Sequence, residues 1–452
     1  MLAPADVEVA RRDPAVPGLA VVLDPEALAD RLAGAPSGDR LISARATYVR
    51  YKPGTSCLVA YRLEVEGGSV AAFAKAYRAG DRAKLAKAAE RAAPGHAVVL
   101  EADLVAVVEA TGDRDLPLPG RLALPDPRRR LLRGLLPDAP DLWDVTPRCL
   151  HYKPERRWVG VVERSGRPYA LVKAYRRADL GQARAGLRFA GRLPLAPRLL
   201  GASARGGALA ISWLPGEPLS EVLAHAAGSA AAVARVGAAL AQLHHQPPSV
   251  LPPAPVAGDA AAIAAAAAAI AVVAPLLGGR AHRLADVLGR RLSTGADVAG
   301  PRHGDFSPDQ VVVGDLGPAI IDFDNAEVGD PAAALGNFAA ALAAAEIDRR
   351  LGGESAQRLT DDLVAGYRSA GGSVSSQRLA SHTGAALVRL AVEPFRHRRP
   401  RWTEQTEALL ARAALVVGEE IPADEHLPAD EDLPADEDLP VDKLPAVEAA
   451  SC

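Results

Sequence analysis

The chain has 452 residues, of which 49% are hydrophobic and 24% charged, a composition that predicts a folded protein with two or three packed units. Its net charge of -3 hides an asymmetry, because residues 419–452 carry twelve acidic residues and one Lys and leave the rest mildly positive. A mild positive excess suits an anionic ligand, but there is no dense basic patch interleaved with aromatic residues. This excludes a typical nucleic-acid-binding surface.

The cysteines and apolar segments indicate the compartment. Cys57, Cys149 and Cys452 show neither metal-ligand nor disulfide spacing, which is typical of the reducing cytoplasm. The first segment, MLAPADVEVARRDPAVPG, has no continuous apolar stretch after a basic start, so we expect no signal peptide. Residues 260–277 form an apolar run, but the run is mostly Ala and contains Pro275. It favours a buried Ala-rich helix over a membrane span.

The clearest pattern in the first half of the chain is an internal repeat. Residues 50–81 resemble residues 151–179, since both contain Tyr-Lys-Pro near the start and Lys-Ala-Tyr-Arg near the end. Each copy predicts a strand, a basic turn, a strand, a Gly-containing turn and a strand, followed by a helix rich in Ala and Arg. Two copies are too few for a solenoid, so we predict a duplicated antiparallel sheet unit.

The pattern changes after the second copy. Residues 193–223 predict two further strands, a Pro-Gly link and a helix with Ser220 as its N-cap. The chain then indicates helices as far as Leu410, except where VVV, GDLG and AIID predict a hairpin. We therefore expect an α+β fold in which a small antiparallel sheet lobe and a large helical lobe flank a cleft.

The last segment, residues 419–452, repeats a six-residue unit (IPADEH, LPADED). Its Pro and acidic residues cannot pack a core, so we predict a disordered tail that is solvated rather than bound to a partner. Four regions are expected in total. They are an N-terminal repeat unit over 1–140, a sheet lobe and hinge over 141–216, a helical lobe over 217–418, and the tail over 419–452.

Two motifs flank the predicted hairpin, HGDFSPDQ at residues 303–310 and IIDFDNAEVGDP at residues 320–331. Phosphoryl transfer needs a carboxylate near the attacking hydroxyl, metal ligands at the phosphates and a Lys on the sheet lobe. Asp305 fits the carboxylate that receives the hydroxyl proton. The hairpin returns Asp322 to the same end of the site, where it would bind magnesium.

Other residues of the two motifs have supporting roles. Gln310 lies five residues after Asp305, where a kinase catalytic loop carries a metal-binding Asn, and it offers the same amide oxygen. We expect Asp324 to support the metal site and His303 to anchor the loop rather than transfer protons. Asp330, which precedes a Pro, fits a helix N-cap and is left out of the catalytic set.

The sheet lobe supplies the expected phosphate contacts. Lys173 lies on a predicted third strand, from which an ammonium group can reach nucleotide phosphates. In the turn KPERR, we expect Lys153, Arg156 and Arg157 to cover the phosphates with positive charge. Lys75 is the counterpart of Lys173 in the first repeat, but no hinge or helical lobe directly follows it. We interpret Lys75 as a relic or a structural residue.

The motifs HGDFSPDQ and IIDFDNAEVGDP, the strand ALVKAY and the hinge ISWLPGEPL resemble the aminoglycoside phosphotransferase and choline kinase superfamily. Its members share the protein-kinase-like bilobal fold and use ATP and magnesium to phosphorylate hydroxyl groups of small molecules. The resemblance implies that Asp305 is the catalytic Asp, Asp322 the metal ligand and Lys173 the phosphate contact. It also implies that the backbone of Ser212 and Leu214 meets the adenine.

The resemblance covers about residues 148–415, with three departures. Gln310 replaces Asn, as in maltokinase-like relatives, which also carry an extra N-terminal domain. Gln182 stands where a Glu normally pairs with the strand Lys, so it can hydrogen-bond Lys173 without neutralising it. Ala334 occupies a position usually held by Asp.

The sequence thus predicts an ATP- and magnesium-dependent kinase for a small-molecule alcohol, such as a sugar, an amino sugar or a related metabolite. The acceptor pocket is expected between residues 307–309 and the helices after Leu335. The basic stretch 393–402 fits an anion site or a solvated helix end. We expect neither a nucleic-acid nor a membrane partner, and the oligomeric state is left open.

Two other functions stay open. A catalytically silent nucleotide-binding module is the alternative, because Gln182 and Ala334 depart from the family pattern. A protein kinase is less favoured, since no DFG…APE activation segment follows Asp322.

Overall fold

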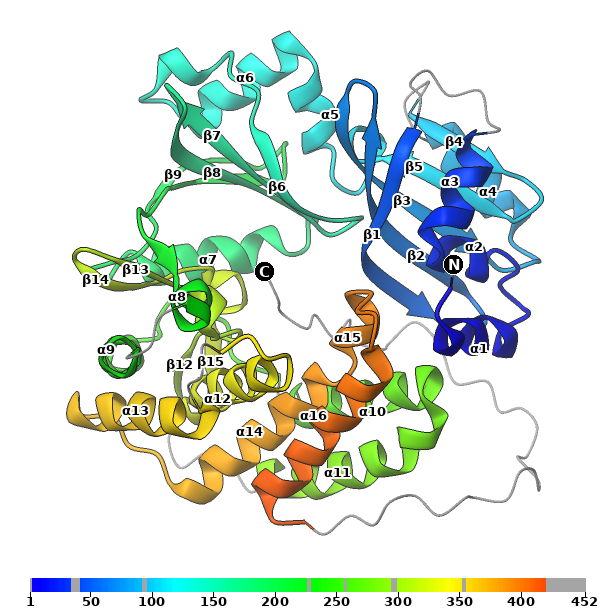
Figure 1. Cartoon of the computed structure of the whole chain (residues 1–452). Helices are drawn as coiled ribbons and strands as arrows, with labels where there is room; N and C mark the ends of the chain where they lie inside the picture. Colours follow the sequence, from blue (N-terminus) through cyan, green and yellow to red (C-terminus); the bar gives the residue numbers. More distant parts are fainter. Residues whose placement is uncertain are drawn as a thin grey trace.

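The computed structural model describes residues 2–33, 41–91, 96–225, 229–255, 258–293, 299–351 and 355–419. The structure consists of two sheet units and a helical lobe (Figure 1), which is the predicted α+β organisation. The predicted acidic tail lies outside the described residues except for Glu419, whose carboxylate accepts a hydrogen bond of 2.7 Å from Arg291.

The N-terminal unit is a five-stranded antiparallel sheet with the order β1-β2-β3-β5-β4. Three helices precede it and one follows the third strand. The helices are α1 (Pro4–Arg12), α2 (Leu19–Leu23), α3 (Pro25–Ala33) and α4 (Arg82–Arg91). The strands are β1 (Leu41–Lys52), β2 (Ser56–Val65), β3 (Gly68–Tyr77), β4 (Ala97–Leu100) and β5 (Val105–Glu109).

The second sheet has the corresponding order, β6-β7-β8-β10-β9. Its strands are β6 (Arg148–Lys153), β7 (Arg157–Arg164), β8 (Arg167–Tyr175), β9 (Leu199–Ser203) and β10 (Ala208–Ser212). Helices α5 (Leu118–Ala123) and α6 (Pro125–Leu135) precede it, and α7 (Leu180–Ala190) follows β8. Because β4 and β5 follow the first copy, the N-terminal sheet contains counterparts of all five strands, two more than the repeat predicts.

A buried aspartate organises the first hairpin turn of each sheet. Asp13 accepts hydrogen bonds from the Tyr51 hydroxyl, at 2.7 Å, and from a backbone N–H of the turn, at 2.8 Å. Asp113 does the same for the Tyr152 hydroxyl and the Glu155 N–H, both at 2.8 Å. Both aspartates lie outside the similar segments, so the sequence repeat did not include them. Asp113 also lies ahead of the boundary expected at residue 141.

The helical lobe holds nine of the described helices and two small sheets. The helices are α8 (Leu219–His225), α9 (Ala230–His244), α10 (Gly258–Val273), α11 (Pro275–Ser293), α12 (Ala332–Ile347), α13 (Ala356–Ser369), α14 (Ser376–Leu390), α15 (Glu393–Arg396) and α16 (Trp402–Val417). The sheets pair β11 (Glu217–Pro218), β13 (Val311–Gly314) and β14 (Gly317–Ile320), and β12 (Gly300–Arg302) with β15 (Glu327–Gly329). The predicted hairpin between the motifs is confirmed as β13–β14.

One local prediction was wrong. Helix α8 already begins at Leu219, so Ser220 lies inside it and is not its N-cap. The predicted Ala-rich helix is α10, which ends at Val273, and α11 begins at Pro275, which lacks an N–H and crowds the preceding backbone. Within the described ranges, no helix is long and apolar enough to cross a membrane.

Buried apolar residues join the two sheet units. One cluster includes Leu58 and Phe73 of the first sheet, Trp158 and Val172 of the second, and Leu132 of α6. Hydrophobic burial therefore fixes one sheet against the other. A separate, larger cluster fills the helical lobe.

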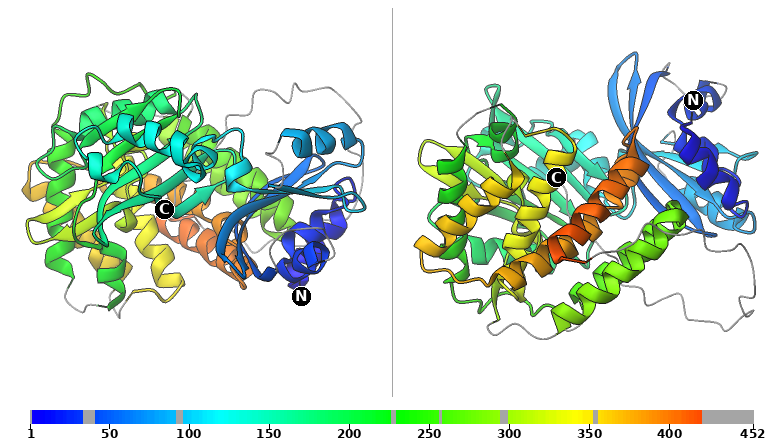
Figure 2. Two further views of the ribbon diagram at one scale, coloured as in Figure 1. Left: turned by 90° about the horizontal axis from the view of Figure 1, so that it is seen from above. Right: turned by 60° about the horizontal axis from the view of Figure 1, so that its bottom comes forward.

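The N-terminal unit also contacts the helical lobe, as the side-by-side placement of α1 and the lobe shows (Figure 2). Asp6 accepts hydrogen bonds from Arg398, at 2.9 and 2.7 Å, and from the Trp402 indole, at 3.2 Å. Arg12 donates to the carbonyls of Val272 and Val273, at 3.0 and 3.1 Å, at the end of α10. The N-terminal unit therefore bridges the second sheet and the helical lobe.

The shared turn architecture makes a stability prediction. We expect Asp113→Ala to lower the free energy of unfolding by about 2–4 kcal/mol, because the Tyr152 hydroxyl and the Glu155 N–H both lose their acceptor. Asp115→Ala, at a neighbouring exposed position, is the control and should change it by less than about 0.5 kcal/mol. Urea unfolding followed by circular dichroism measures both, and equal effects would contradict the role of Asp113.

Candidate active site

His303 joins the two motifs at the foot of the β13–β14 hairpin. Its ring lies against Phe306 and Phe323, with ring centres 5.8 and 5.0 Å away, and its Nε2–H donates to the Ile321 carbonyl at 2.7 Å. Burial lowers the pKa of His303 to about 4. At neutral pH the ring is therefore uncharged, and its contacts hold the two motif segments together.

Both motif segments contain left-handed backbone. Gly304 has φ of +84°, and a Cβ there would lie 2.2 Å from the Asn325 carbonyl oxygen, so only Gly permits this approach. Asp322 has φ of +62°, which is uncommon for a residue with a side chain. Such backbone strain is frequent where a side chain must point into a functional site.

Asp305 has an isolated carboxylate at the edge of a cavity. It makes no hydrogen bond or ion pair with any residue that the structure describes. Burial and the nearby charge of Asp322 raise the pKa of Asp305 to about 7, although Lys153, Arg157 and Arg389 oppose this shift. A carboxyl group with a pKa near neutrality and a free hydrogen-bonding capacity suits a general base.

Asp322 and Asp324 share a compact ion cluster with two cations from the second sheet. Lys173 Nζ lies 2.6 Å from Asp322 Oδ1 and 3.3 Å from Asp324 Oδ2. Arg157 Nη2 lies 2.7 Å from Asp322 Oδ1 and 2.8 Å from Asp324 Oδ2. The Tyr175 hydroxyl donates to Asp324 at 3.0 Å. The cluster brings Lys173 of one lobe to Asp322 of the other.

The cluster keeps Asp322 ionised. Burial alone would raise the pKa of Asp322, but the charges and hydrogen bonds of Arg157 and Lys173 hold it well below its usual range. The pKa of Asp324 is raised, mainly by burial and also by the charge of Asp322. One firmly ionised carboxylate therefore lies beside a second that gains a proton more easily.

These carboxylates fit magnesium as a donor set. Magnesium prefers oxygen ligands and usually takes one or two protein carboxylates, with the remaining positions filled by substrate phosphates and water. Asp322 and Asp324 supply two carboxylates on one side of the site. Over the described part of the chain, no three His, Cys, Asp or Glu side chains gather as an all-protein metal site. The donor set therefore suits a metal that is shared with a phosphate ligand.

The three cations predicted in the basic turn between β6 and β7 make different contacts. Arg157 begins β7 and contacts the ion cluster, whereas Arg156 lies in the turn, where its N–H donates to the Lys153 carbonyl at 3.1 Å. The Lys153 ammonium lies 5.6 Å from the ring centre of Tyr48 in the N-terminal unit. Of the three, only Arg157 directly contacts Asp322.

The hinge follows β10. The Ser212 N–H donates to the Arg198 carbonyl at 2.9 Å, and the Trp213 N–H donates to the Tyr169 carbonyl at 3.1 Å. The Leu214 N–H has no hydrogen-bond acceptor among the described residues. Leu214 is therefore able to donate to a nucleotide base, whereas the Ser212 N–H is already used.

Three other positions are placed as follows. Gln182, in the first turn of α7, is exposed and lines the cavity, and within the described ranges no hydrogen bond joins it to Lys173. Lys173 uses Asp322 and Asp324 instead. Gln310 is buried at the foot of β13, and its backbone carbonyl accepts a hydrogen bond from the Ile321 N–H at 2.9 Å. Ala334 packs in the apolar core of the helical lobe.

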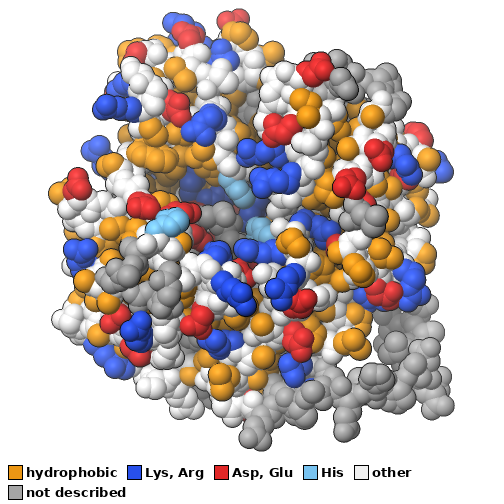
Figure 3. All heavy atoms as spheres, in the orientation of Figure 1, with side chains coloured by type: hydrophobic (Ala, Val, Ile, Leu, Met, Phe, Trp, Pro, Cys, Tyr) orange, Lys and Arg blue, Asp and Glu red, His pale blue; other side chains and the backbone are white. Residues whose placement is uncertain are grey.

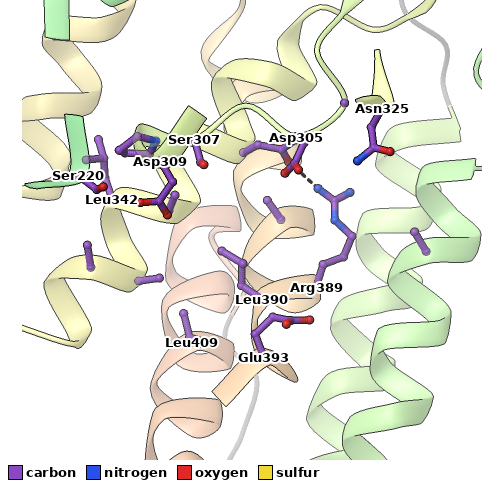
Figure 4. A pocket seen from close by; sticks show the side chains of 18 of the residues that line it. Ser220, Asp305, Ser307, Asp309, Asn325, Leu342, Arg389, Leu390, Glu393 and Leu409 are labelled. Carbon is purple, nitrogen blue, oxygen red and sulfur yellow. Dashed lines mark hydrogen bonds between the residues drawn. The ribbon is translucent and has the colours of Figure 1, made fainter. Parts of the chain in front are cut away.

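A cavity of about 840 Å³ opens beside Asp305 (Figure 3), in the hollow of the face that carries many Lys and Arg side chains. Residues 307–309 and the helices after Leu335 line it as predicted, and α10 contributes Asp259 as well. Arg389 of α14 points toward Asp305 in this cavity (Figure 4). No sequence pattern pointed to Arg389, because an Arg within a helix usually faces water.

Most charged groups along the cavity are paired. Arg302 lies 2.9 Å from Asp259 and 2.5 Å from Glu327. The basic stretch 393–402 is used in the same way, and ion pairs join Arg396 to Glu393, Arg398 to Asp6, Arg399 to Asp348 and Arg401 to Glu404. These cations therefore neutralise the acids of this region and do not form an isolated anion site.

Comparisons with known proteins address the same region. Residues 148–373, half of the chain, match the family model of the phosphotransferase enzyme family (APH). No curated protein matches the sequence.

Similar solved structures are distant. A choline/ethanolamine kinase family protein from Mesorhizobium loti is 15% identical, with 64% of this chain and 94% of that chain covered and a TM-score of 0.46. The aminoglycoside phosphotransferase APH(3'')-Id from Streptomyces rimosus is 19% identical, with 57% and 97% covered and a TM-score of 0.43. The choline kinase from Cryptosporidium parvum is 12% identical, with 64% and 94% covered and a TM-score of 0.46.

The family match spans both motifs, the strand that carries Lys173 and the hinge. The family assignment rests on this matched segment and not on the distant structural similarities. The chain therefore belongs to the phosphotransferase enzyme family.

Proposed function

We propose that the protein transfers the γ-phosphoryl group of ATP to a hydroxyl group of an uncharged polyhydroxylated molecule, most simply a sugar. One observation carries the proposal. The Asp305 carboxylate has no partner among the described residues and lies between an 840 Å³ cavity and the ion cluster around Asp322. An acceptor in the cavity and phosphates at the cluster would thus meet at Asp305.

Asp305 acts on the acceptor in this proposal. Its carboxylate accepts a hydrogen bond from the hydroxyl group and orients the oxygen toward the γ-phosphorus. A new oxygen–phosphorus bond forms, the bond to the β-phosphate oxygen breaks, and ADP leaves with that oxygen. The hydroxyl proton passes to Asp305 late in the transfer.

The ion cluster acts on the nucleotide. Lys173 and Arg157 provide positive charge for the phosphates, with Lys153 and Arg156 at the adjoining turn, and the Leu214 N–H contacts the base. Asp322, supported by Asp324 and Gln310, would hold magnesium, which supplies charge that neutralises the phosphates. Lys173 and Arg157 both contact Asp322, which supports a site in which the cations for the phosphates and the metal ligand lie together.

The charges of the cavity favour an uncharged acceptor. Arg302 forms ion pairs with both Asp259 and Glu327 in the wall nearest α10. Arg389, half-buried beside Asp305, donates to the Asn337 side chain at 2.5 Å and lies 4.0 Å from Asp259. A positive charge there repels an ammonium group near the reacting hydroxyl, whereas guanidinium and amide groups hydrogen-bond sugar hydroxyls.

Asp305→Asn tests the catalytic role. Asn has nearly the same shape but cannot take the proton, so we expect kcat to fall by about 10²- to 10⁴-fold, the usual contribution of a general base. ADP release in the presence of acceptor measures kcat, and calorimetry should show that ATP still binds. ATP-dependent transfer at the wild-type rate by this variant would overturn the proposal, whereas binding without transfer by the wild-type protein would favour the silent module.

The raised pKa of Asp305 makes a second prediction. The folded state disfavours the carboxylate, so the stability contributed by protonated Asp305 is full at pH values below the ordinary Asp pKa and is lost as the pH rises through about 7. An Asn at this position is neutral at every pH, so the variant does not lose this stability as the pH rises. We therefore expect Asp305→Asn to raise the melting temperature at pH 8 and to raise it less at pH 5. The same difference at both pH values would contradict the pKa shift.

The cavity charges predict acceptor preference. A neutral sugar should have kcat/KM at least about tenfold above that of the matching amino sugar, which replaces one hydroxyl by an ammonium group. Arg389→Gln keeps a donor for Asn337 but removes the charge, so it should narrow this ratio. A preference for the amino sugar in the wild-type protein would refute the proposed acceptor class, and the KM for ATP serves as the control for an intact nucleotide site.

A further inference from the structure

The N-terminal unit holds the basic turn of the second sheet through Glu155 at its tip. The Lys75 ammonium donates to Glu155 Oε1 at 2.8 Å, and Arg50 contacts the other carboxylate oxygen. All three side chains are about four-fifths buried. In Figure 1 the β6–β7 hairpin points toward β1, which carries Arg50. The tip of one sheet unit is thus fixed by ion pairs from the other.

The repeat explains the position of Lys75. Lys75 lies on β3 between Leu58 and Ala106, and Lys173 lies at the same place on β8, between Val159 and Leu209. Each Lys has a carboxylate partner. For Lys173 the partner comes from the helical lobe, whereas for Lys75 it comes from the turn of the neighbouring sheet.

The backbone of the turn indicates why Glu155 is informative. Its φ is +61°, in the left-handed region that disfavours residues with a side chain. Gly54, the equivalent residue in the first sheet, adopts φ of +63° without that cost. Burial alone would raise the pKa of Glu155, but Lys75 and Arg50 lower it, so the carboxylate stays ionised in its ion pairs with them.

The turn continues directly into the nucleotide side of the site. Arg157 follows Glu155 by two positions and contacts Asp322 at 2.7 Å. On the other flank, Lys153 lies over the Tyr48 ring of the N-terminal unit. Since that unit also binds the helical lobe through Asp6 and Arg398, it can fix the turn relative to Asp322.

We propose that Lys75 and Arg50, acting through Glu155, position the β6–β7 turn so that its cations meet the nucleotide phosphates. The N-terminal unit then sets nucleotide affinity without contacting the reacting atoms. This inference rests on the proposed function, and Lys75 and Glu155 are positioning residues in it.

Lys75→Met and Glu155→Gly test the proposal together. Both should raise the KM for ATP about five- to tenfold, the effect of weakening one charge contact, with kcat changed less than about twofold and the acceptor KM unchanged. Glu155→Gly also relieves the backbone cost, so its melting temperature should stay close to the wild-type value while ATP binding weakens. A purely structural Glu155 would give the reverse pattern.

Two further variants complete the series. Lys75→Arg keeps the charge and should retain the wild-type KM for ATP. Lys84→Met removes an exposed ion pair with Asp81 in the same unit and serves as the matched control. Wild-type KM values in both Lys75→Met and Glu155→Gly would overturn the inference.

Hydrogen–deuterium exchange of residues 153–157 in Lys75→Met provides a readout that does not require activity. Faster exchange in the turn, with Lys84→Met unchanged, is the expected result. Unchanged exchange would refute the claim that Lys75 positions the turn, whether or not the proposed reaction is correct. Absence of ATP-dependent transfer in the wild-type protein would instead refute the proposed function, and with it the role in nucleotide affinity.

Discussion

The hydrogen bond between Lys173 and Asp322, at 2.6 Å, is the contact on which the arrangement of the site depends. Lys173 comes from the central part of the second sheet, and Asp322 follows the hairpin of the helical lobe. Two carboxylates and two cations meet there, so neither partner is a lone buried charge, which would be costly. Next to this cluster, burial and the charge of Asp322 raise the pKa of Asp305, whereas the charge of Arg157 lowers it.

The rest of the fold supports this contact from outside. The His303 ring fixes the two motif segments, and the shared apolar cluster fixes the two sheets against each other. The N-terminal unit contacts the second sheet through Glu155 and the helical lobe through Asp6. A unit that touches both sides of the site can limit how far the lobes move apart, and this links the repeat to the proposed nucleotide binding.

The sequence predicted those parts whose chemistry depends on residue type and order. Asp305, Asp322 and Lys173 were singled out because each lies in a motif with a strand or turn of predictable type, and their roles stay predictions. Their contacts could not be predicted in the same way. Gln182 was matched with Lys173 from its place in the family pattern, but Lys173 is satisfied by Asp322 and Asp324.

Other features depend on long-range packing that no local pattern contains. Asp13 and Asp113 lie far in sequence from the turns that they stabilise, and Arg389 faces the cavity only because of how α14 packs. Lys75 was interpreted as a relic or a structural residue, since no hinge or helical lobe directly follows the first repeat. Its partner is Glu155, 80 positions further along the chain.

Phosphorus NMR of a single reaction mixture tests the central claim most directly. With wild-type protein, ATP, magnesium and a neutral sugar, we expect the γ-phosphate signal to be replaced by a phosphate monoester signal, with ADP formed in equal amount. Release of inorganic phosphate in place of the monoester, or ATP that remains unchanged across a panel of neutral sugars at saturating concentration, would contradict the account.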